Sequence, residues 1–281
     1  MKRVLICSDG SAYSQVCCEY AAWLAGRTAC RFEVLYVTDL RQFEVPMIAD
    51  LSGSLGVQPY QAILGKLQEL EQEKARVVLE EAARFFAERA PSVEVTTTHR
   101  TGFLVDCLSD YEKDADLVML GKRGENANFA TEHLGSTMER VVRASKKPCL
   151  VTSRAFKPIE RVLLAFDGGK SGRRALEFLE KDDTLRGLEL HVVIVAARET
   201  EEASLATLRE AEERLTAAGF NPVCQMMHGI PEDEIADYIE AKAINLIIMG
   251  AYGHSRIRHL VIGSTTAEMM RQCRVPVLLF R

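Results

Sequence analysis

The 281-residue sequence lacks the apolar run of about 20 residues that a membrane-spanning helix requires. It also lacks a strong excess of either charge, since 35 Lys and Arg residues against 40 Asp and Glu residues give a formal net charge of −5. That balance argues against binding to nucleic acid or to an anionic membrane through the protein's overall charge. The first residues turn polar at Ser8 and Asp9, too early for the apolar region of a signal peptide. We therefore expect a cytoplasmic protein with no nucleic-acid partner and no membrane insertion.

The eight cysteines lack the C-x-x-C spacing and the nearby histidines that structural metal sites use. Cys7, Cys149 and Cys224 lie within apolar runs, where a free thiol packs as a small hydrophobic side chain. The six histidines do not pair at metal-ligand spacing either, and we interpret His191, which lies in an apolar run, as structural. The sequence thus predicts reduced thiols and no metal site.

Signatures of several ATP-using enzymes are missing as well. The Walker A pattern G-x-x-x-x-G-K-[ST] does not occur, and no S-G-G-x-D-S motif follows the first apolar run. The H-I-G-H and K-M-S-K-S elements of synthetases are absent, although residues 253–260 hold similar letters. No Ser-His-Asp arrangement can be read from the sequence. A binding protein is therefore favoured over an enzyme.

What the sequence does contain is a long internal repeat. Three segments of the first half return in the same order in the second half: 2–14 as 160–172, 101–124 as 228–253, and 134–154 as 262–281. We interpret this as a tandem duplication of one domain. The polar segment 154–160, interrupted by Pro158, predicts the boundary, giving domains 1–155 and 156–281.

Each half alternates short Val/Ile/Leu runs with longer amphipathic segments. The runs predict strands at 3–7, 32–37, 93–98, 116–120, 149–152, 161–166, 188–195, 222–227, 245–249 and 276–280. The amphipathic segments predict helices at 12–26, 62–89, 103–113, 136–145, 171–180, 200–218, 231–242 and 264–272.

Apolar strands separated by helices indicate a parallel sheet covered on both faces. The fold class is therefore α/β: two tandem doubly wound five-stranded parallel-sheet domains of Rossmann-like type. The fifth strands of the two halves, 149–152 and 276–280, are apolar enough to be buried edges. Residues 39–60 of the first half, rich in loop-forming residues, are predicted to form a long excursion or lid.

Ligands of doubly wound sheets bind beyond the carboxyl ends of the strands. Asp9-Gly10, Asp167-Gly168 and two glycine-containing loops occupy those places. The triplet 263–265, Gly-Ser-Thr, opens a predicted helix, whose free N–H groups and positive dipole end favour phosphate. Any one of these glycines is better explained as an ordinary loop or capping residue, but the whole set occurs twice, which favours a binding site.

In the second half the set reads Gly250-x2-Gly253-x9-Gly263-Ser264, and with the early Asp-Gly pair it resembles the universal stress protein family. The segments "GIPEDEI", "INLIIMG" and "PVLLFR" are similar to that family too, and the resemblance covers both halves. It implies a tandem universal stress protein with the adenine-nucleotide alpha-hydrolase-like fold. Because members of that family usually pair their domains, it also implies an intrachain pseudo-dimer of the two halves with their fifth strands close together. It further implies a cytoplasmic stress-response protein that, in the ATP-binding branch, holds ATP or AMP, with Mg²⁺ accompanying the phosphates.

The resemblance also assigns nucleotide-binding residues in each half. In the second half they are Asp167, Gly168, Val195, Met249, Gly250, Gly253, Gly263, Ser264 and Thr265. In the first half they are Asp9, Gly10, Val37, Leu120, Gly121, Gly124, Gly135, Ser136 and Thr137. The acid is expected at the nucleoside, the strand-two valine at the adenine, and the glycine loop with its hydroxyls at ribose and phosphates.

Both halves depart from the family pattern. In the first half ten residues, not nine, separate Gly124 from Gly135, and Glu125 puts a negative charge in the loop. In the second half Gly169 stands where the family often has Ser. The basic loop residues have two interpretations, contact with phosphate or a solvated rim that pairs with acidic helices: Lys122, Arg123, Arg256 and Arg258.

Three functions remain open from the sequence. The first is a non-catalytic adenine-nucleotide sensor that acts on an unidentified regulated protein. The second is a slow ATPase that uses Asp9 or Asp167 with Mg²⁺. The third is a nucleotide-free dimerisation or scaffold module. Further homodimerisation of the whole chain is compatible with each of them.

Overall fold

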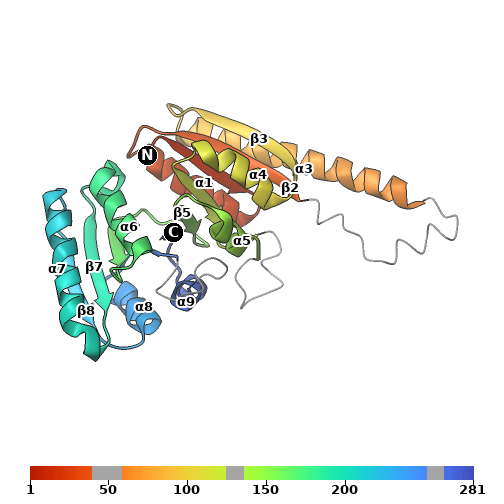
Figure 1. Ribbon diagram of the computed structural model, residues 1–281. Coiled ribbons are helices and arrows are strands. Elements are labelled where there is room, and N and C mark those ends of the chain that lie inside the picture. Colours follow the sequence, from red (N-terminus) through yellow and green to blue (C-terminus); the bar gives the residue numbers. More distant parts are fainter. Residues whose placement is uncertain (40–58, 125–135, 252–262) are drawn as a thin grey trace.

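The computed structural model of the protein describes residues 1–39, 59–124, 136–251 and 263–281. These residues form a ten-stranded sheet with the order β3-β2-β1-β4-β5-β10-β9-β6-β7-β8 (Figure 1). The strands of the first half are β1 (Arg3–Ser8), β2 (Arg31–Asp39), β3 (Val95–Gly102), β4 (Leu117–Gly121) and β5 (Cys149–Thr152). Those of the second half are β6 (Arg161–Ala165), β7 (Glu189–Val195), β8 (Val223–Met227), β9 (Leu246–Gly250) and β10 (Val277–Phe280).

The strand order has the same pattern in both halves, and within each half all pairs are parallel. The halves join where β5 and β10 pair antiparallel, with Leu150 opposite Leu278. The prediction that the fifth strands lie close together is therefore confirmed. Because this pair is antiparallel, the sheet is mixed, and each five-stranded half is parallel within it.

The helices cover both faces of the sheet, as the doubly wound prediction requires. They are α1 (Ala12–Ala25), α3 (Pro59–Arg89), α4 (Leu104–Tyr111), α5 (Ser136–Ala144), α6 (Lys170–Lys181), α7 (Glu201–Ala217), α8 (Pro231–Ala241) and α9 (Ser264–Gln272). Short 3₁₀ turns lie at η2 (Glu112–Asp114), η4 (Asp183–Leu185) and η5 (Arg198–Thr200).

Two apolar clusters fill the space between helices and sheet. One includes buried side chains of α1, α3, α6 and α7, and the other those of α4, α5, α8 and α9. Alternate strand residues enter opposite clusters, as Leu5 and Ile6 of β1 do. Both clusters run through both halves of the chain, so the ten strands enclose a continuous core on each face.

Two elements differ from their predicted positions for physical reasons. The strand predicted at 93–98 lies instead at β3, because β3 pairs with β2 along its whole length at the sheet edge. There Thr96 and Thr97 face solvent, so the strand carries no apolar run to mark it. The helix predicted at 103–113 ends as α4 at Tyr111 and continues as η2.

Helix α3 extends beyond the body of the first half (Figure 1). From Gly65 onward, where its side chains are described, the first buried residue is Ala75, while Leu67 and Leu70 are 44% and 66% exposed. The predicted excursion at 39–60 precedes this helix, and its residues 40–58 lie outside the described part of the chain.

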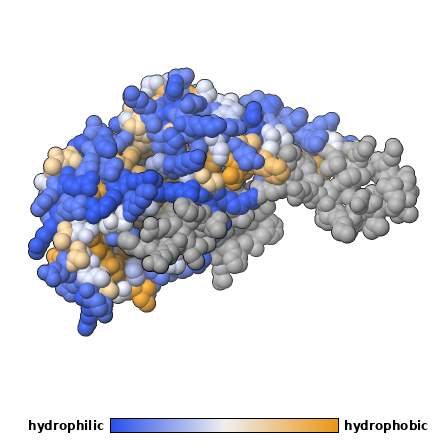
Figure 2. Space-filling view, viewed as in Figure 1, coloured by the Kyte–Doolittle hydropathy of each residue, from blue (hydrophilic) through white to orange (hydrophobic). Residues whose placement is uncertain are grey.

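The surface seen in Figure 2 is mostly hydrophilic, with hydrophobic residues in small separate patches. Within the described residues, no helix is long and apolar enough to cross a membrane. All eight cysteines are free thiols, which fits the predicted reduced state.

Candidate functional site

The two Asp-Gly pairs form the same turn at the ends of β1 and β6. Oδ1 of Asp9 accepts a hydrogen bond from the Ser11 backbone N–H at 3.0 Å, and Oδ1 of Asp167 accepts one from the Gly169 N–H at 2.8 Å. Such turns are a common use of Asp at the start of a loop. Each turn places a carboxylate at the carboxyl end of the sheet, where the sequence predicts a ligand.

The glycine of each turn is required by backbone conformation and by packing. Gly10 and Gly168 have φ angles of 80° and 68°, in the left-handed region that favours glycine. A Cβ atom at Gly10 would lie 2.5 Å from a methyl group of Val78 in α3, and one at Gly168 would lie 2.8 Å from the Thr207 methyl in α7. Helices α3 and α7 therefore pack directly against the turns.

In the first half the glycine loop after β4 reaches the carboxylate after β1. A Cβ atom at Gly124 would lie 2.6 Å from Oδ2 of Asp9. The structure thus brings together two residues that the sequence assigned to one site although they are 115 positions apart (124 − 9). Gly253, the corresponding residue of the second half, lies outside the described residues, as does Gly135.

The glycines that end β4 and β9 have a packing role. A Cβ atom at Gly121 would lie 2.7 Å from Cβ of Tyr13, and one at Gly250 would lie 2.9 Å from Cβ of Ser171. Tyr13 and Ser171 lie in the first turns of α1 and α6. The missing side chains let each strand end lie against the helix that follows the Asp turn.

Helix α9 begins at Ser264, as predicted. Its N-cap is Gly263, and no side-chain hydrogen bond caps the helix. The Gly263 N–H donates to the Ala251 carbonyl at 3.1 Å, which ties the start of the helix to the end of β9. Ser264 is exposed at the first helical position.

The two threonines that follow Ser264 donate to protein groups. The Thr265 hydroxyl donates to Oε2 of Glu232 in α8 at 3.2 Å, and the Thr266 hydroxyl donates to the Gly250 carbonyl at 3.0 Å. Sequence reasoning missed both Thr266 and Glu232. A threonine two positions after a Gly-Ser pair carries no signal of its own, because its partner is a strand end 16 residues away.

The predicted apolar contacts lie at the same ends of the sheet. Val37 and Val195, near the ends of β2 and β7, are half-buried, while Leu120 and Met249 are 4% and 5% exposed. In the first half Thr137 is exposed in α5, and the side chain of Ser136 lies outside the described part.

His228, which follows β8, is a polar residue at the edge of this region. Its Nδ1 lies 3.1 Å from the Ala196 carbonyl oxygen, and its Nε2 lies 3.9 Å from Oε2 of Glu201. His191 is buried between the Tyr238 hydroxyl at 2.8 Å and the Glu189 carboxylate at 2.9 Å. Its structural role is as the sequence predicted.

Lys122, one of the basic loop residues, contacts the other half of the chain. Its ammonium donates to the carbonyl oxygens of Cys273 at 2.8 Å and of Arg271 at 3.2 Å, at the carboxyl end of α9 in the other half. Burial lowers the pKa of Lys122 to about 8. Arg256 and Arg258 lie outside the described residues.

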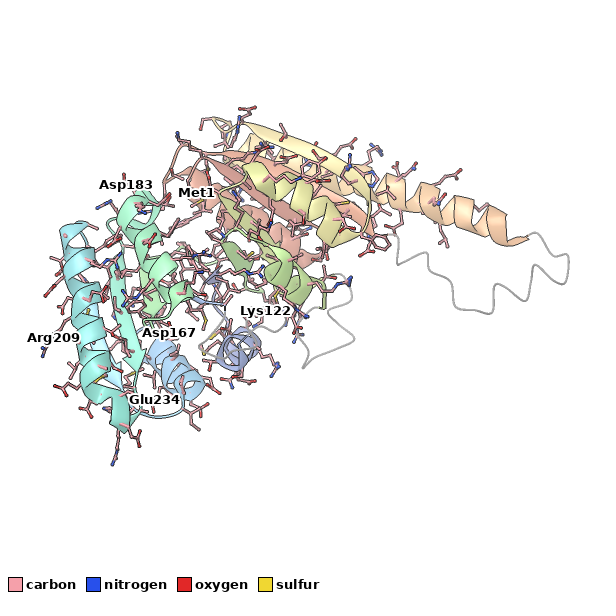
Figure 3. All side chains as sticks on the ribbon, viewed as in Figure 1. Met1, Lys122, Asp167, Asp183, Arg209 and Glu234 are labelled. Carbon is pink, nitrogen blue, oxygen red and sulfur yellow. The ribbon has the colours of Figure 1, made fainter. Side chains whose placement is uncertain are left out.

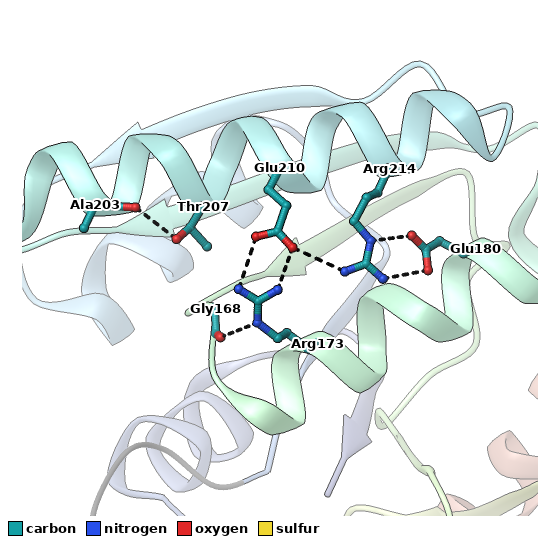
Figure 4. A network of polar contacts seen from close by, with 7 residues as sticks. All are labelled: Gly168, Arg173, Glu180, Ala203, Thr207, Glu210 and Arg214. Carbon is teal, nitrogen blue, oxygen red and sulfur yellow. Dashed lines mark hydrogen bonds and ion pairs between the residues drawn. The ribbon is translucent and has the colours of Figure 1, made fainter.

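An ion-pair network holds the Asp167 turn against α7 (Figure 4). Nε of Arg173 donates to the Gly168 carbonyl at 3.1 Å, while its other nitrogens donate to Glu210 at 2.6 and 3.1 Å. Arg214 contacts Glu210 and makes two bonds to Glu180 at 2.6 and 2.8 Å. These hydrogen bonds lower the pKa values of the Glu210 and Glu180 carboxyls.

Among the described residues, this network lies in the second half. Gln15 occupies the position in the first half that corresponds to Arg173. The sequence carried a weak signal, the Glu210 and Arg214 pair at i,i+4 spacing, but nothing in it identified Arg173 as the partner. Within the described residues no group of three His, Cys, Asp or Glu side chains is arranged to hold a metal ion.

Comparisons with known proteins point to one family. The model of the universal stress protein family matches residues 1–153 and again residues 158–281. A universal stress protein of Synechocystis sp. is 44% identical over 287 residues that cover the whole of both chains. One from Mycolicibacterium smegmatis is 26% identical over 302 residues, covering 99% of this chain and 96% of that one. The crystal structure of a universal stress protein from Archaeoglobus fulgidus has a TM-score of 0.74 at 23% identity, over 99% of this chain and 96% of the other.

Proposed function

Because the chain belongs to the universal stress protein family, with two copies of the domain in tandem, we propose that it binds adenine nucleotide, ATP or AMP, and acts as a non-catalytic stress-response regulator in the cytoplasm. Nucleotide occupancy would alter the order of the glycine loops and so the binding of a regulated protein. We place the domain boundary at residues 155 and 156, within the linker between the two matched segments.

The observation that carries this proposal is the position of Gly250. Its Cα lies against Ser171 in the first turn of α6, and its carbonyl accepts the Thr266 hydroxyl of α9. The Asp167 turn that leads into α6 and the N-terminus of α9 therefore meet at one strand end. A carboxylate suited to ribose hydroxyls thus lies near a helix N-terminus suited to phosphate.

In the second half, the roles follow from the chemistry of each group. Asp167 would accept hydrogen bonds from the nucleoside, and Val195 with Met249 would give the adenine an apolar wall. The first N–H groups of α9, with the exposed Ser264 hydroxyl, would donate to phosphate oxygens. Gly168, Gly250 and Gly253 would shape the loops around them.

The Thr265 hydroxyl donates to Glu232, so it is less suited to phosphate than Ser264. The Glu232 carboxylate at this place would repel an unscreened phosphate chain, which favours AMP or a cation-bound ATP. Mg²⁺ would fit here as an ion held mainly by phosphate oxygens.

In the first half the same roles fall to Asp9, Gly10, Val37, Leu120, Gly121, Gly124, Gly135, Ser136 and Thr137. The contact between Gly124 and the Asp9 carboxylate supports a loop that closes over the nucleoside. We propose that both halves bind, with the second half as the better defined site.

A slow ATPase is the alternative, with Asp9 or Asp167 positioning Mg²⁺ and water. The turn geometry favours binding, because Oδ1 of each carboxylate already accepts a backbone N–H. A nucleotide-free scaffold is the other alternative. In either alternative the two halves would act together as an intrachain pseudo-dimer. Whole chains would pair further in a homodimer.

The test is the nucleotide content of the purified protein. The protein is denatured, and the released nucleotide is identified by chromatography and counted per chain. We expect AMP or ATP at up to two per chain, about half of it lost in Asp9→Ala or Asp167→Ala and all of it in the double variant. ATP turnover with and without Mg²⁺ then separates a sensor from an ATPase. A parent protein that carries no nucleotide and binds none in titration contradicts the proposal.

A further inference from the structure

The carboxyl end of α9 is held by a residue from the other half of the chain. The Lys122 ammonium donates to the carbonyl oxygens of Arg271 and Cys273, the last turn of α9 and its C-cap (Figure 3). A cation near the carboxyl end of a helix satisfies carbonyls that lack partners within the helix and interacts favourably with its dipole. Here that cation belongs to the first half, and the helix to the second.

The corresponding helix of the first half is held in the reciprocal way. Nη1 of Arg281, which follows β10 in the second half, donates to the Arg143 carbonyl in the last turn of α5 at 3.1 Å. The Arg281 carbonyl in turn accepts a hydrogen bond from Arg174 of α6. Each half therefore supplies a cation to the carboxyl end of one helix in the other half.

The two helices held in this way are α5 and α9, whose N-termini carry the residues proposed to bind phosphate. Each helix has nine residues, so each is about 13 Å long. An α-helix of this length moves as a rigid rod, and a change in the position of its last carbonyls moves its first N–H groups.

Lys122 also connects α9 to the glycine loop of the first half. It directly follows Gly121, and its backbone N–H donates to the Thr152 carbonyl at the end of β5 at 3.1 Å. A rearrangement of the loop 121–124 around a nucleotide would therefore be transmitted to the carbonyl end of α9.

We propose that Lys122 and Arg281 are positioning residues that couple the two nucleotide sites. Through them, each half fixes the position of the phosphate-binding helix in the other half. This inference rests on the proposed nucleotide-binding function. Binding in the first half stabilises the Lys122 contact and thereby raises the affinity of the second half, and linkage requires the reverse effect as well.

The chemistry of Lys122 gives this coupling a pH signature. Burial lowers its pKa to about 8, so the ammonium loses its proton within an accessible range. Among the described residues, two titratable groups act on it: the Cys273 thiol, which raises its pKa, and the Arg123 guanidinium, which lowers it. Burial raises the pKa of Cys273 to about 11, so that thiol stays neutral near pH 8, and the Arg271 side chain is paired with Glu268 at 2.6 Å.

The experiment measures ATP binding to the full chain with one site removed. In an Asp9→Ala background, only the second half binds, and Lys122→Met is added. We expect about 3- to 10-fold weaker binding, although Lys122 lies in the first half. Lys122→Arg should keep most of the affinity. The matched control is Lys181→Met, which removes a surface lysine that is 75% exposed and should change nothing.

The reciprocal arm uses an Asp167→Ala background with Arg281→Met, where we expect a similar loss in the first half. A pH series completes the design. Second-half affinity should fall as the pH rises from 7 to 9 in the Asp9→Ala protein, because Lys122 loses its charge. The fall should disappear in Lys122→Met and in Lys122→Arg. Without nucleotide, Lys122→Met should also speed amide exchange in the first turn of α9.

The outcomes separate the two proposals. If the parent binds ATP but Lys122→Met leaves second-half affinity and α9 exchange unchanged, the coupling is wrong and the proposed function stands. Lys122→Met is therefore also measured in the Asp167→Ala background, in which only the first half binds. If Lys122→Met weakens binding there and not in the Asp9→Ala background, Lys122 serves its own loop and the inference is overturned. If the parent binds no adenine nucleotide, both proposals are overturned.

Discussion

A Cβ atom at Gly124 would lie 2.6 Å from Oδ2 of Asp9, so the loop after β4 and the turn after β1 are in contact at a position where a side chain would meet the carboxylate. Gly124→Ala must push the carboxylate or the loop away. We expect at least about tenfold weaker ATP binding in the first half, measured by calorimetry in an Asp167→Ala background. Gly65→Ala is the control, because a Cβ at Gly65 has no neighbour within 4 Å. Equal affinity in Gly124→Ala would remove Asp9 from the first-half site.

Gly250→Ala should lower the stability of the fold. The added methyl would lie 2.9 Å from Cβ of Ser171 and 3.3 Å from the Gly172 nitrogen, so β9 or α6 must shift. We expect a loss of about 1 to 3 kcal/mol in the free energy of unfolding, measured by urea denaturation. Gly26→Ala makes only an ordinary contact of 3.5 Å and should be close to neutral. A loss shared equally by both variants would point to a general effect of replacing glycine.

Gly263→Val should separate phosphate binding from nucleoside binding. The backbone at Gly263, with φ of −55° and ψ of 143°, accepts a side chain, so the fold should survive. The valine side chain would block the approach of phosphate to the first N–H groups of α9. ATP affinity should therefore fall steeply in titrations, and adenosine affinity much less. A folded Gly263→Val protein that binds ATP as tightly as the parent would contradict the phosphate site.

Two further variants of the same half give graded results. Ser264→Ala removes one hydroxyl donor and leaves the backbone N–H groups, so ATP binding should weaken by about 1 to 2 kcal/mol. Asp167→Ala should weaken ATP and AMP by similar factors, because Asp167 acts at the nucleoside. If Asp167→Ala affected ATP alone, the carboxylate would belong to the phosphate end of the site.

Arg173→Met should affect the second half and spare the first. It releases the Gly168 carbonyl and Glu210, whereas the corresponding residue of the first half is Gln15, whose neutral amide forms no ion pair. Since Arg173 and Glu210 are 43% and 42% exposed, solvent screens the pair, and the free energy of unfolding should change little. ATP affinity of the second half should decrease most at low salt, because salt already weakens the parent network. A loss that is equal in both halves would exclude a local role in the Asp167 turn.

Stability should fall at alkaline pH because of buried thiols. Burial raises the pKa values of Cys7, Cys18 and Cys149 to about 12 from an ordinary value of 9.0. Above about pH 9 these thiols ionise in the unfolded chain but stay protonated in the folded one, which favours unfolding. Each group then lowers the free energy of unfolding by up to about 1.4 kcal/mol per pH unit until its folded pKa is reached.

Cys149→Ala isolates one of these groups. The difference in unfolding free energy between parent and variant should narrow between pH 9 and pH 10, because only the parent carries this thiol. Urea denaturation at the two pH values measures the difference. A gap that stays constant would mean that the Cys149 thiol ionises equally in both states.

The sequence predicted those elements whose signal lies within a few consecutive residues. Strands such as β4 and β9 are short apolar runs followed by glycine, and α9 begins at the predicted residue. The prediction placed strand β3 too early in the chain, because a strand at the sheet edge, paired on one side only, needs no run of apolar residues. The Asp turns were also predictable, since their partners lie two residues along the chain.

The remaining site contacts could not be predicted, because they depend on which elements the fold brings together. The contact of Gly250 with Ser171 spans 79 residues (250 − 171), and that of Lys122 with Cys273 spans 151. In the sequence Gly250 and Gly121 have the appearance of loop glycines, whereas in the fold they let a strand end pack against a helix. The spacing of the motif therefore predicted where the site lies but not the structural role of each residue in it.

The antiparallel pairing of β5 and β10 has a consequence for how the protein responds to dilution. In a pair of separate chains this seam would form and dissociate with protein concentration. Here the short linker between β5 and β6 keeps the two strands at a high effective concentration, so the seam persists however dilute the protein is. The halves cannot be exchanged for those of another molecule while the seam holds. The two halves differ in sequence, for example in Gln15 of the first half and Arg173 at the corresponding position of the second. Because both halves belong to one chain, every molecule pairs one half of each kind.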